Sequence, residues 1–205
     1  MMPIEVWLGF VGVALVFMAT PGPSHLLMVS NTLSSGLSRS VATAVGDLTA
    51  NAIQMLAAGL GVSALLATFP AATTGILIAG GCYIAWLGLE KLRSNHVADT
   101  LQALAPATRQ QLWLQGFMTS MTNPKAIIFF AAFFPPFVRA TYYVLDWLLL
   151  SITYVAIDGT FLLTYGLLAN RLAAVISGRQ RMHLERACGA GLLIVALVVI
   201  ITAWR

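Results

Sequence analysis

The feature that most restricts the fold of this chain is a succession of long apolar segments. Six of them follow one another, at about residues 4–29, 41–69, 72–92, 112–134, 142–169 and 187–204. Charged residues make up only 9% of the 205 residues, whereas soluble domains carry about 25%. Because about 20 apolar residues cross a bilayer as a helix, we expect an all-α membrane protein with six transmembrane helices.

The polar residues between these segments are too few for a second domain, so we expect one transmembrane domain that covers residues 1–205. The longest polar stretch, residues 95–111, is predicted to be an exposed loop. It separates a first repeat, about residues 1–94, from a second, about residues 112–205. The first apolar segment is long, lacks a basic leader and is followed by further spans. It is therefore expected to stay as the first helix and not to be removed as a signal peptide.

Helix-breaking residues interrupt the first and the fourth apolar segments, at Thr20-Pro21-Gly22-Pro23 and at Asn123-Pro124-Lys125. Proline frees a backbone carbonyl group one turn earlier, and that group needs a partner where little water is present. A lysine at the centre of a membrane helix adds a cost of about 2.5–3.5 kcal/mol. We therefore predict that helices 1 and 4 are broken and that the function involves these breaks. The alternatives are that Lys125 snorkels to the interface or that this stretch is a loop.

Unusual residues recur in the same order in both halves of the chain. The second and fifth segments each contain an interior aspartate, Asp47 and Asp158, and Asp47 shares a helical face with Asn51 and Gln54. The third and sixth segments carry small residues suited to close helix packing: Gly81 and Ala85, Ala187 and Gly191. A repeat of three spans must be inverted in the membrane because three is odd. The chain is thus predicted to form two inverted three-helix repeats, with a site near the bilayer midplane as in many secondary transporters.

These residues supply the charges that a zwitterion needs. Half-helices that begin at Pro23 and Pro124 expose unpaired N–H groups that attract anions, and Lys125 adds a full positive charge. Asp47 or Asp158 can pair with an ammonium group, and one of them can carry a proton through a transport cycle. A purely structural ion pair between Lys125 and an aspartate is the alternative. The predicted substrate-binding or coupling residues are Thr20, Pro21, Gly22, Pro23, Asp47, Asn51, Asn123, Pro124, Lys125 and Asp158.

Other reactive side chains are interpreted as structural. His25 is expected to be a packed or interfacial residue in preference to a proton relay. Cys82 and Cys188 lie in apolar segments without ligand spacing and are expected to pack, so no metal site and no cofactor is predicted. The net charge of +4 does not indicate a nucleic-acid partner, because basic residues in a membrane chain set its topology first.

The basic residues are distributed unequally between the two sides. The loops after the first, third and fifth segments hold Arg39, Lys91, Arg93, Arg109, Arg171, Arg179, Arg181 and Arg186. The opposite side holds only Arg139 and Arg205. The positive-inside rule therefore predicts that these three loops face the cytoplasm of a bacterial cell and that both termini are periplasmic.

The two breaks also resemble a known family. Ala19-Thr20-Pro21-Gly22-Pro23, and Thr122-Asn123-Pro124-Lys125-Ala126 with Phe129-Phe130, are similar to motifs of the LysE/RhtB amino-acid exporters. The length, the six spans and Gly46-Asp47 agree with that family. The resemblance implies export of amino acids or close derivatives across the inner membrane, driven by the proton gradient. Pro135-Pro136-Phe137 departs from the more usual proline-glutamine-phenylalanine, which puts the identity of the substrate in doubt more than the transport role.

The leading hypothesis is secondary efflux of neutral or small amino acids. The expected partners of the protein are this amino-acid substrate, protons and the lipid bilayer. A membrane-embedded enzyme is an alternative, but no nucleophile–base set occurs among the membrane polar residues. A metal-ion effluxer of similar architecture would need clustered His, Cys or carboxylate ligands. A passive channel is a further alternative, and the sequence leaves homo-oligomerisation open.

Overall fold

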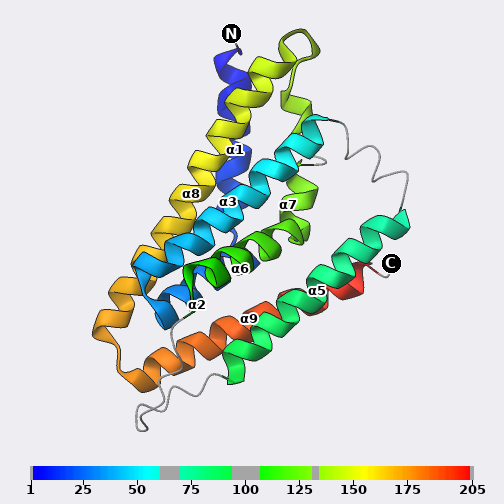
Figure 1. Ribbon diagram of the computed structural model, residues 1–205. Helices are drawn as coiled ribbons and strands as arrows, with labels where there is room; N and C mark the ends of the chain where they lie inside the picture. Colours follow the sequence, from blue (N-terminus) through cyan, green and yellow to red (C-terminus); the bar gives the residue numbers. More distant parts are fainter. Residues whose placement is uncertain (1, 61–69, 94–106, 131–133, 204–205) are drawn as a thin grey trace.

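The computed structural model describes residues 2–60, 70–93, 107–130 and 134–203, and over these ranges the chain is helical without strands. Figure 1 shows its α-helices: α1 (Ile4–Ala19), α2 (Pro23–Ser35), α3 (Leu37–Gly59), α5 (Pro70–Arg93), α6 (Arg109–Met121), α7 (Pro124–Ile128), α8 (Tyr143–Val175) and α9 (Gly178–Ala203). Two short 3₁₀ helices, η2 (Pro135–Phe137) and η3 (Ala140–Tyr142), precede α8. The predicted all-α class is confirmed. The end of the predicted second span, residues 61–69, and most of the predicted polar loop lie outside the described residues.

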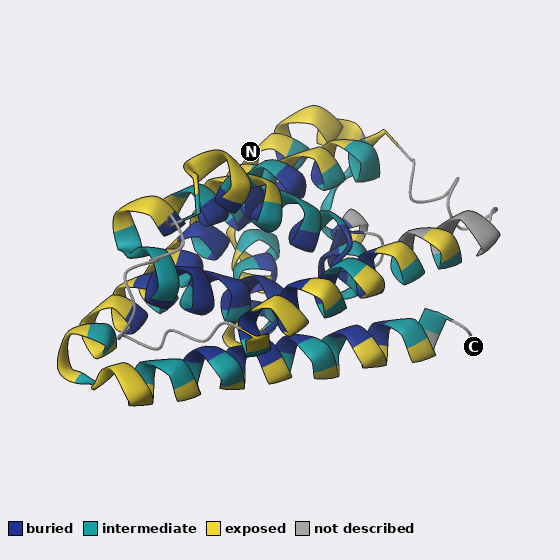
Figure 2. Cartoon of the chain, turned by 60° about the horizontal axis from the view of Figure 1, so that its bottom comes forward, coloured by how far each residue is buried: buried dark blue, intermediate teal, exposed yellow. Residues whose placement is uncertain are grey.

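The distribution of polar and apolar side chains is that of a membrane protein. Large apolar residues point outward, among them Val16, Ile152 and Ile194, which are 73%, 67% and 65% exposed. Asp47 and Asp158 are buried instead, and Figure 2 shows the buried faces of the helices turned inward. A soluble protein does not expose so much apolar surface, whereas lipid covers such a surface without cost.

Among the described residues, two helices are long and apolar enough to cross a membrane by themselves. They are Tyr143–Val175 and Gly178–Ile201, with mean hydropathies of 1.5 and 2.2. The pair α1 and α2 meets the same test as one bent span. The chain therefore passes the membrane more than once.

Helices break at both of the predicted positions. The axes of α1 and α2 differ by 55°, and α6 and α7 are separated by Thr122 and Asn123. Each new helix begins with proline, Pro23 in α2 and Pro124 in α7, where the missing N–H would be unpaired in any case. The Asn123 side chain caps α7 by accepting a hydrogen bond from the Lys125 N–H at 3.0 Å.

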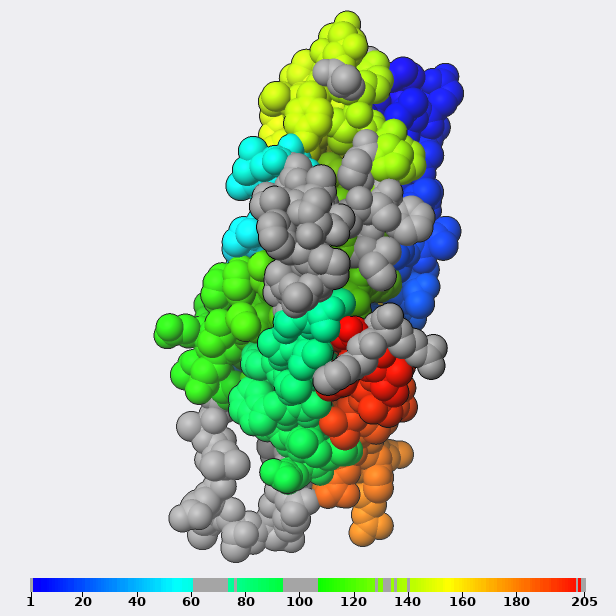
Figure 3. Space-filling model, turned by 90° about the vertical axis from the view of Figure 1, so that its right-hand side faces the viewer, coloured from blue at the N-terminus to red at the C-terminus, as the bar shows by residue number. Residues whose placement is uncertain are grey.

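Glycines bring two pairs of helices into backbone contact. A Cβ atom added to Gly46 of α3 would lie 2.0 Å from the Trp113 carbonyl oxygen of α6, and one added to Gly116 would lie 2.1 Å from that of Thr43. Gly88 of α5 and Gly189 of α9 face each other in the same way. Figure 3 shows α5 and α9 side by side on one face of the molecule. The third and sixth segments therefore pack closely against each other. Of the glycines that the sequence suggested for this packing, Gly81 approaches Ile200 of α9, whereas Gly191 approaches Leu26 of α2.

Aromatic side chains fill the core between α1, α7 and α8. The ring of Phe10 packs edge-on against Phe129 and Phe134, with centroids 6.0 and 5.8 Å apart. Tyr154 of α8 packs against Phe129 and Phe130. This core lies next to the two helix breaks and holds α8 against them.

Two stretches that the sequence suggested as loops are helical instead. The basic stretch 171–186 is divided between α8 and α9, which are separated only by Ile176 and Ser177. Ser177 caps α9 through hydrogen bonds with Gln180. The polar stretch 30–40 likewise belongs to α2 and α3, with a bend at Gly36, whose φ of 79° favours glycine. Arginine and glutamine are good helix formers, so a helix need not end where its apolar residues end.

Candidate substrate site

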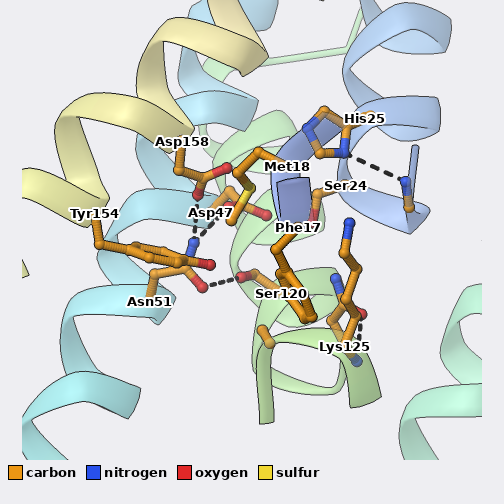
Figure 4. Close-up of a pocket in the computed structure, with 13 residues that line it drawn as sticks. Phe17, Met18, Ser24, His25, Asp47, Asn51, Ser120, Lys125, Tyr154 and Asp158 are labelled. Atoms are coloured by element: carbon orange, nitrogen blue, oxygen red, sulfur yellow. Dashed lines mark hydrogen bonds between the residues drawn. The ribbon is translucent and has the colours of Figure 1, made fainter. Parts of the chain in front are cut away.

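The two helix breaks and the two interior aspartates surround one cavity. Six of the ten predicted residues line it, from α2, α3, α7 and α8 and the residues before them: Gly22, Asp47, Asn51, Asn123, Lys125 and Asp158. Its volume is about 20 Å³, which is room for about one water molecule. Figure 4 shows these side chains converging from elements that are far apart in the sequence.

Asn51 joins the two aspartates. Its Nδ2 donates hydrogen bonds to Asp47 Oδ2 at 2.9 Å and to Asp158 Oδ2 at 2.6 Å. Its Oδ1 accepts one from the Ser120 hydroxyl at 2.9 Å. Asp47 and Asn51 are one turn apart on α3, which explains their common orientation, and the packing of α8 adds Asp158. All three side chains are buried, and Asp47 Oδ1 has no hydrogen-bond partner among the described residues.

Lys125 connects the two helix breaks. Its Nζ donates a hydrogen bond to the Thr20 carbonyl oxygen at 2.5 Å and lies 4.7 Å from the centre of the Phe17 ring. The lysine thereby satisfies a carbonyl group that the end of α1 leaves unpaired. The ion pair with Asp47 or Asp158 that the sequence left open is not formed: within the described ranges, Lys125 has no carboxylate partner.

The first turn of α2 forms a further wall of the cavity. The Gly22 N–H donates a hydrogen bond to His25 Nδ1 at 3.3 Å. A Cβ atom at Gly22 would lie 3.6 Å from the Lys125 side chain, an ordinary van der Waals distance, so the side chain passes close to the break at Gly22. His25 is only 4% exposed and lines the cavity.

The remaining predicted residues shape the backbone and do not line the cavity. Thr20 and Pro21 are exposed in the break, where Thr20 offers its carbonyl group to Lys125. Pro23 and Pro124 occupy the first positions of α2 and α7. Their part is to end one helix and start the next.

Sequence reasoning missed several polar residues of the cavity, namely Ser24, His25, Ser120 and Tyr154. Tyr154 lies one turn before Asp158 on α8, so the helical period places both on one face. Ser24 and His25 follow Pro23 directly. Ser120 had no comparable signal, because its position depends on how α6 packs against α3.

Metal ligands are not grouped in the described part of the chain: no three His, Cys, Asp or Glu side chains there come close enough to hold an ion. The polar groups of the cavity are one lysine, two carboxylates, one imidazole, amides and hydroxyls. This set can bind an organic ion through charge and hydrogen bonds.

Comparisons with known proteins give a consistent result. Residues 15–203 match the family described as LysE type translocator. The chain is 32% identical over 176 residues, 85% of its length and 86% of the relative's, to an uncharacterised membrane protein of Vibrio cholerae. It is 27% identical over 200 residues, 97% of each chain, to a homoserine/homoserine lactone efflux protein of Salmonella typhimurium. An uncharacterised membrane protein of Pseudomonas aeruginosa is 30% identical over 203 residues, 95% of this chain and 93% of the relative's. No solved structure matches the chain.

Proposed function

Because the chain belongs to the LysE type translocator family, we propose that it is a secondary exporter of small or neutral amino acids, or close derivatives, across the bacterial inner membrane. Membership indicates a transporter and not an enzyme. The efflux activity in the name of the Salmonella typhimurium relative supports amino-acid cargo. The observation that carries the proposal is the cavity between two broken helices, which is lined by one cation and two carboxylates.

The proposed architecture is a single domain of two inverted repeats, about residues 1–94 and 112–205. Three features support it: α2 and α7 both begin with proline at a break, α3 and α8 each contribute one buried aspartate, and α5 packs against α9. The proposal includes six spans and, from the distribution of basic residues, two periplasmic termini. Cysteine labelling from one side of the membrane tests this: Arg179→Cys should react from the cytoplasm, and periplasmic labelling would contradict it.

A zwitterionic amino acid fits the distribution of charge. Lys125 has only neutral partners within the described residues, so its charge is available to a carboxylate, and the first turn of α2 lies beside it. Asp47 and Asp158 lie across the cavity, where they can accept hydrogen bonds from an ammonium group. The two poles of the cavity therefore correspond to the two charges that every amino acid carries.

The aspartate pair also supports proton coupling. Two adjacent negative charges in a site with little water are costly, and one bound proton removes much of that cost. Binding of an ammonium group would have the same effect. Cargo and proton would thus compete for one pair of carboxylates, which is the requirement for exchange of one against the other.

Transport requires the helices around the cavity to separate. The present volume of about 20 Å³ holds about one water molecule, and any amino acid is several times larger. The breaks between α1 and α2 and between α6 and α7 are natural points of bending, since the regular backbone hydrogen bonds are interrupted there. We infer that the cavity opens alternately to the two sides of the membrane.

Counterflow in liposomes tests the proposal. Vesicles that contain the purified protein are loaded with an unlabelled amino acid, and uptake of the labelled compound is followed for homoserine, threonine, leucine, cysteine and lysine. We expect exchange of at least one small or neutral cargo, and net uptake of the same cargo into unloaded vesicles when a pH gradient is applied. Exchange of none would overturn the proposal. Net uptake that ignores the pH gradient would remove proton coupling only.

A further inference from the structure

The imidazole of His25 is a buried polar group that the proposed charge pairing does not use. It lies in the first turn of α2, is 4% exposed and borders the cavity together with Lys125 and Asp47. Figure 4 shows it above the Lys125 side chain, and one of its ring nitrogens is bonded to the Gly22 N–H. What the second ring nitrogen does is therefore relevant to cargo binding.

The hydrogen bonds of His25 determine where its proton lies. Nδ1 accepts a hydrogen bond from the Gly22 N–H at 3.3 Å, so it cannot carry a hydrogen itself. The neutral ring then carries its proton on Nε2. That nitrogen is buried and has no hydrogen-bond partner among the described residues. His25 thus presents an N–H donor without an acceptor, and leaving such a donor unpaired costs free energy.

Neighbouring rings hold the imidazole in this orientation. Its centroid lies 4.8 Å from that of Tyr165 and 6.5 Å from that of Phe161, both on α8. Turning the ring would break the bond from Gly22 and disturb these contacts. The donor is therefore fixed in place before cargo arrives, which favours selective recognition.

We propose that His25 is a specificity-determining residue whose Nε2–H donates a hydrogen bond to an oxygen atom in the side chain of the cargo. The inference rests on the proposed function: Lys125 and the aspartates take the carboxylate and the ammonium group common to all amino acids. The neutral Nε2–H donor of His25 then remains for the side chain, which is the part that differs between amino acids. Phe17, Met18 and Ala126 add apolar surface around it. The cargo class is then amino acids or derivatives with a hydroxyl or carbonyl oxygen on a short side chain.

The test compares two cargoes that differ in one group. Homoserine carries a side-chain hydroxyl where norvaline carries a methyl group, and counterflow in liposomes gives kcat/KM for each. We expect the wild-type protein to prefer homoserine by about tenfold to a hundredfold, the usual effect of leaving a buried donor unpaired. His25→Phe should reduce the preference to near one, and His25→Gln, which keeps an N–H donor, should retain part of it.

Tyr165→Phe is the matched control, because it keeps the ring against His25 and should leave the preference unchanged. If His25→Phe lowers kcat/KM equally for both cargoes, His25 binds a group that they share, and the inference is overturned. A wild-type protein that exchanges both equally would overturn it too, even if neither variant folds. Exchange of no amino acid at all would instead refute the proposed function, and the inference with it.

Discussion

At the scale of single residues, two side chains organise the cavity in different ways. Asn51 donates from one amide nitrogen to both Asp47 and Asp158, and so keeps two carboxylates side by side. Lys125 is bound to a backbone carbonyl of the opposite break and to no carboxylate in the described part of the chain. The two aspartates are therefore held side by side by a shared amide, whereas the charge of Lys125 remains available to a bound carboxylate.

Replacing Lys125 should impair transport more than folding. Lys125→Ala removes the cation and leaves the Thr20 carbonyl without its donor, so we expect efflux to fall by about tenfold to a hundredfold, as for loss of a charged hydrogen bond. Lys125→Arg should retain more activity because it keeps the charge. Counterflow measures the effect, and size-exclusion chromatography in detergent reports folding. Arg179→Ala, at an exposed position, is the control; unaltered efflux in Lys125→Ala would remove Lys125 from the site.

Neutralising the aspartates one at a time tests the coupling of protons to cargo. Asp47→Asn and Asp158→Asn both keep a side chain of similar shape beside Asn51. If one carboxylate carries the proton, its variant should still exchange cargo for cargo but lose net uptake driven by a pH gradient, while the other variant should lose cargo binding. The measurements are counterflow and net uptake into unloaded vesicles under a pH gradient. Identical, mild losses in both variants would count against proton coupling.

At the scale of helices, the fold depends on places where two backbones touch. Gly46 and Gly116 let α3 and α6 approach so closely that a Cβ atom would overlap a carbonyl oxygen of the other helix. Asp47 follows Gly46 directly, and Ser120 lies one turn after Gly116. The same contact that packs the two helices therefore sets the position of the cavity walls.

Replacing glycine with alanine should have different effects on stability at glycines that touch another helix and at glycines that face open space. Gly46→Ala and Gly116→Ala should destabilise the protein by about 1–3 kcal/mol, because the clash is with backbone and cannot be relieved by a side-chain rotation. Gly12→Ala and Gly75→Ala are matched controls, since a Cβ atom there meets nothing within 4 Å. Alanine in an open helical position should be neutral or stabilising by up to about 1 kcal/mol. Thermal unfolding in detergent distinguishes the two sets, and equal effects would refute the close approach of α3 and α6.

At the scale of the whole molecule, a second buried polar cluster ties helices together at one end. Lys91 Nζ of α5 donates to Asn31 Oδ1 of α2 at 2.9 Å. Asn31 Nδ2 donates in turn to Thr43 Oγ1 at 3.0 Å and Gln115 Oε1 at 2.9 Å, on α3 and α6. In Figure 1 the end of α5 and the junctions α2–α3 and α8–α9 lie at this end, opposite the N-terminus of α1. The basic residues of these described segments are thus gathered at one end of the molecule.

Breaking this cluster should reduce the stability of the molecule. Lys91→Met leaves Asn31 Oδ1 as a buried acceptor without its donor, and we expect a loss of about 1–3 kcal/mol. Arg93→Met is the control, because Arg93 is exposed two residues further along the same helix. Thermal unfolding in detergent compares them. A melting temperature in Lys91→Met as high as in Arg93→Met would show that the cluster contributes little.

Local sequence patterns suffice to predict the helical class, the membrane environment, both helix breaks and the three charged residues of the candidate site, Asp47, Lys125 and Asp158. These features are local: about 20 apolar residues fix a span, proline fixes a break, and a buried charge in an apolar stretch is too costly to be incidental. The family follows from the same motifs, and the match over residues 15–203 confirms it.

Which of these groups contact one another depends on tertiary packing. Lys125 binds the Thr20 carbonyl and not an aspartate, and Asn51 donates to Asp158, 107 positions further along the chain, as well as to Asp47. His25, expected to be packed or interfacial, is packed against aromatic rings and also lines the cavity. These contacts depend on how the helices pack, which no local pattern encodes; between α3 and α6 the approach is set by glycines that touch the backbone of the other helix. The charged residues of the site can thus be identified from the sequence, whereas their partners depend on how the helices pack.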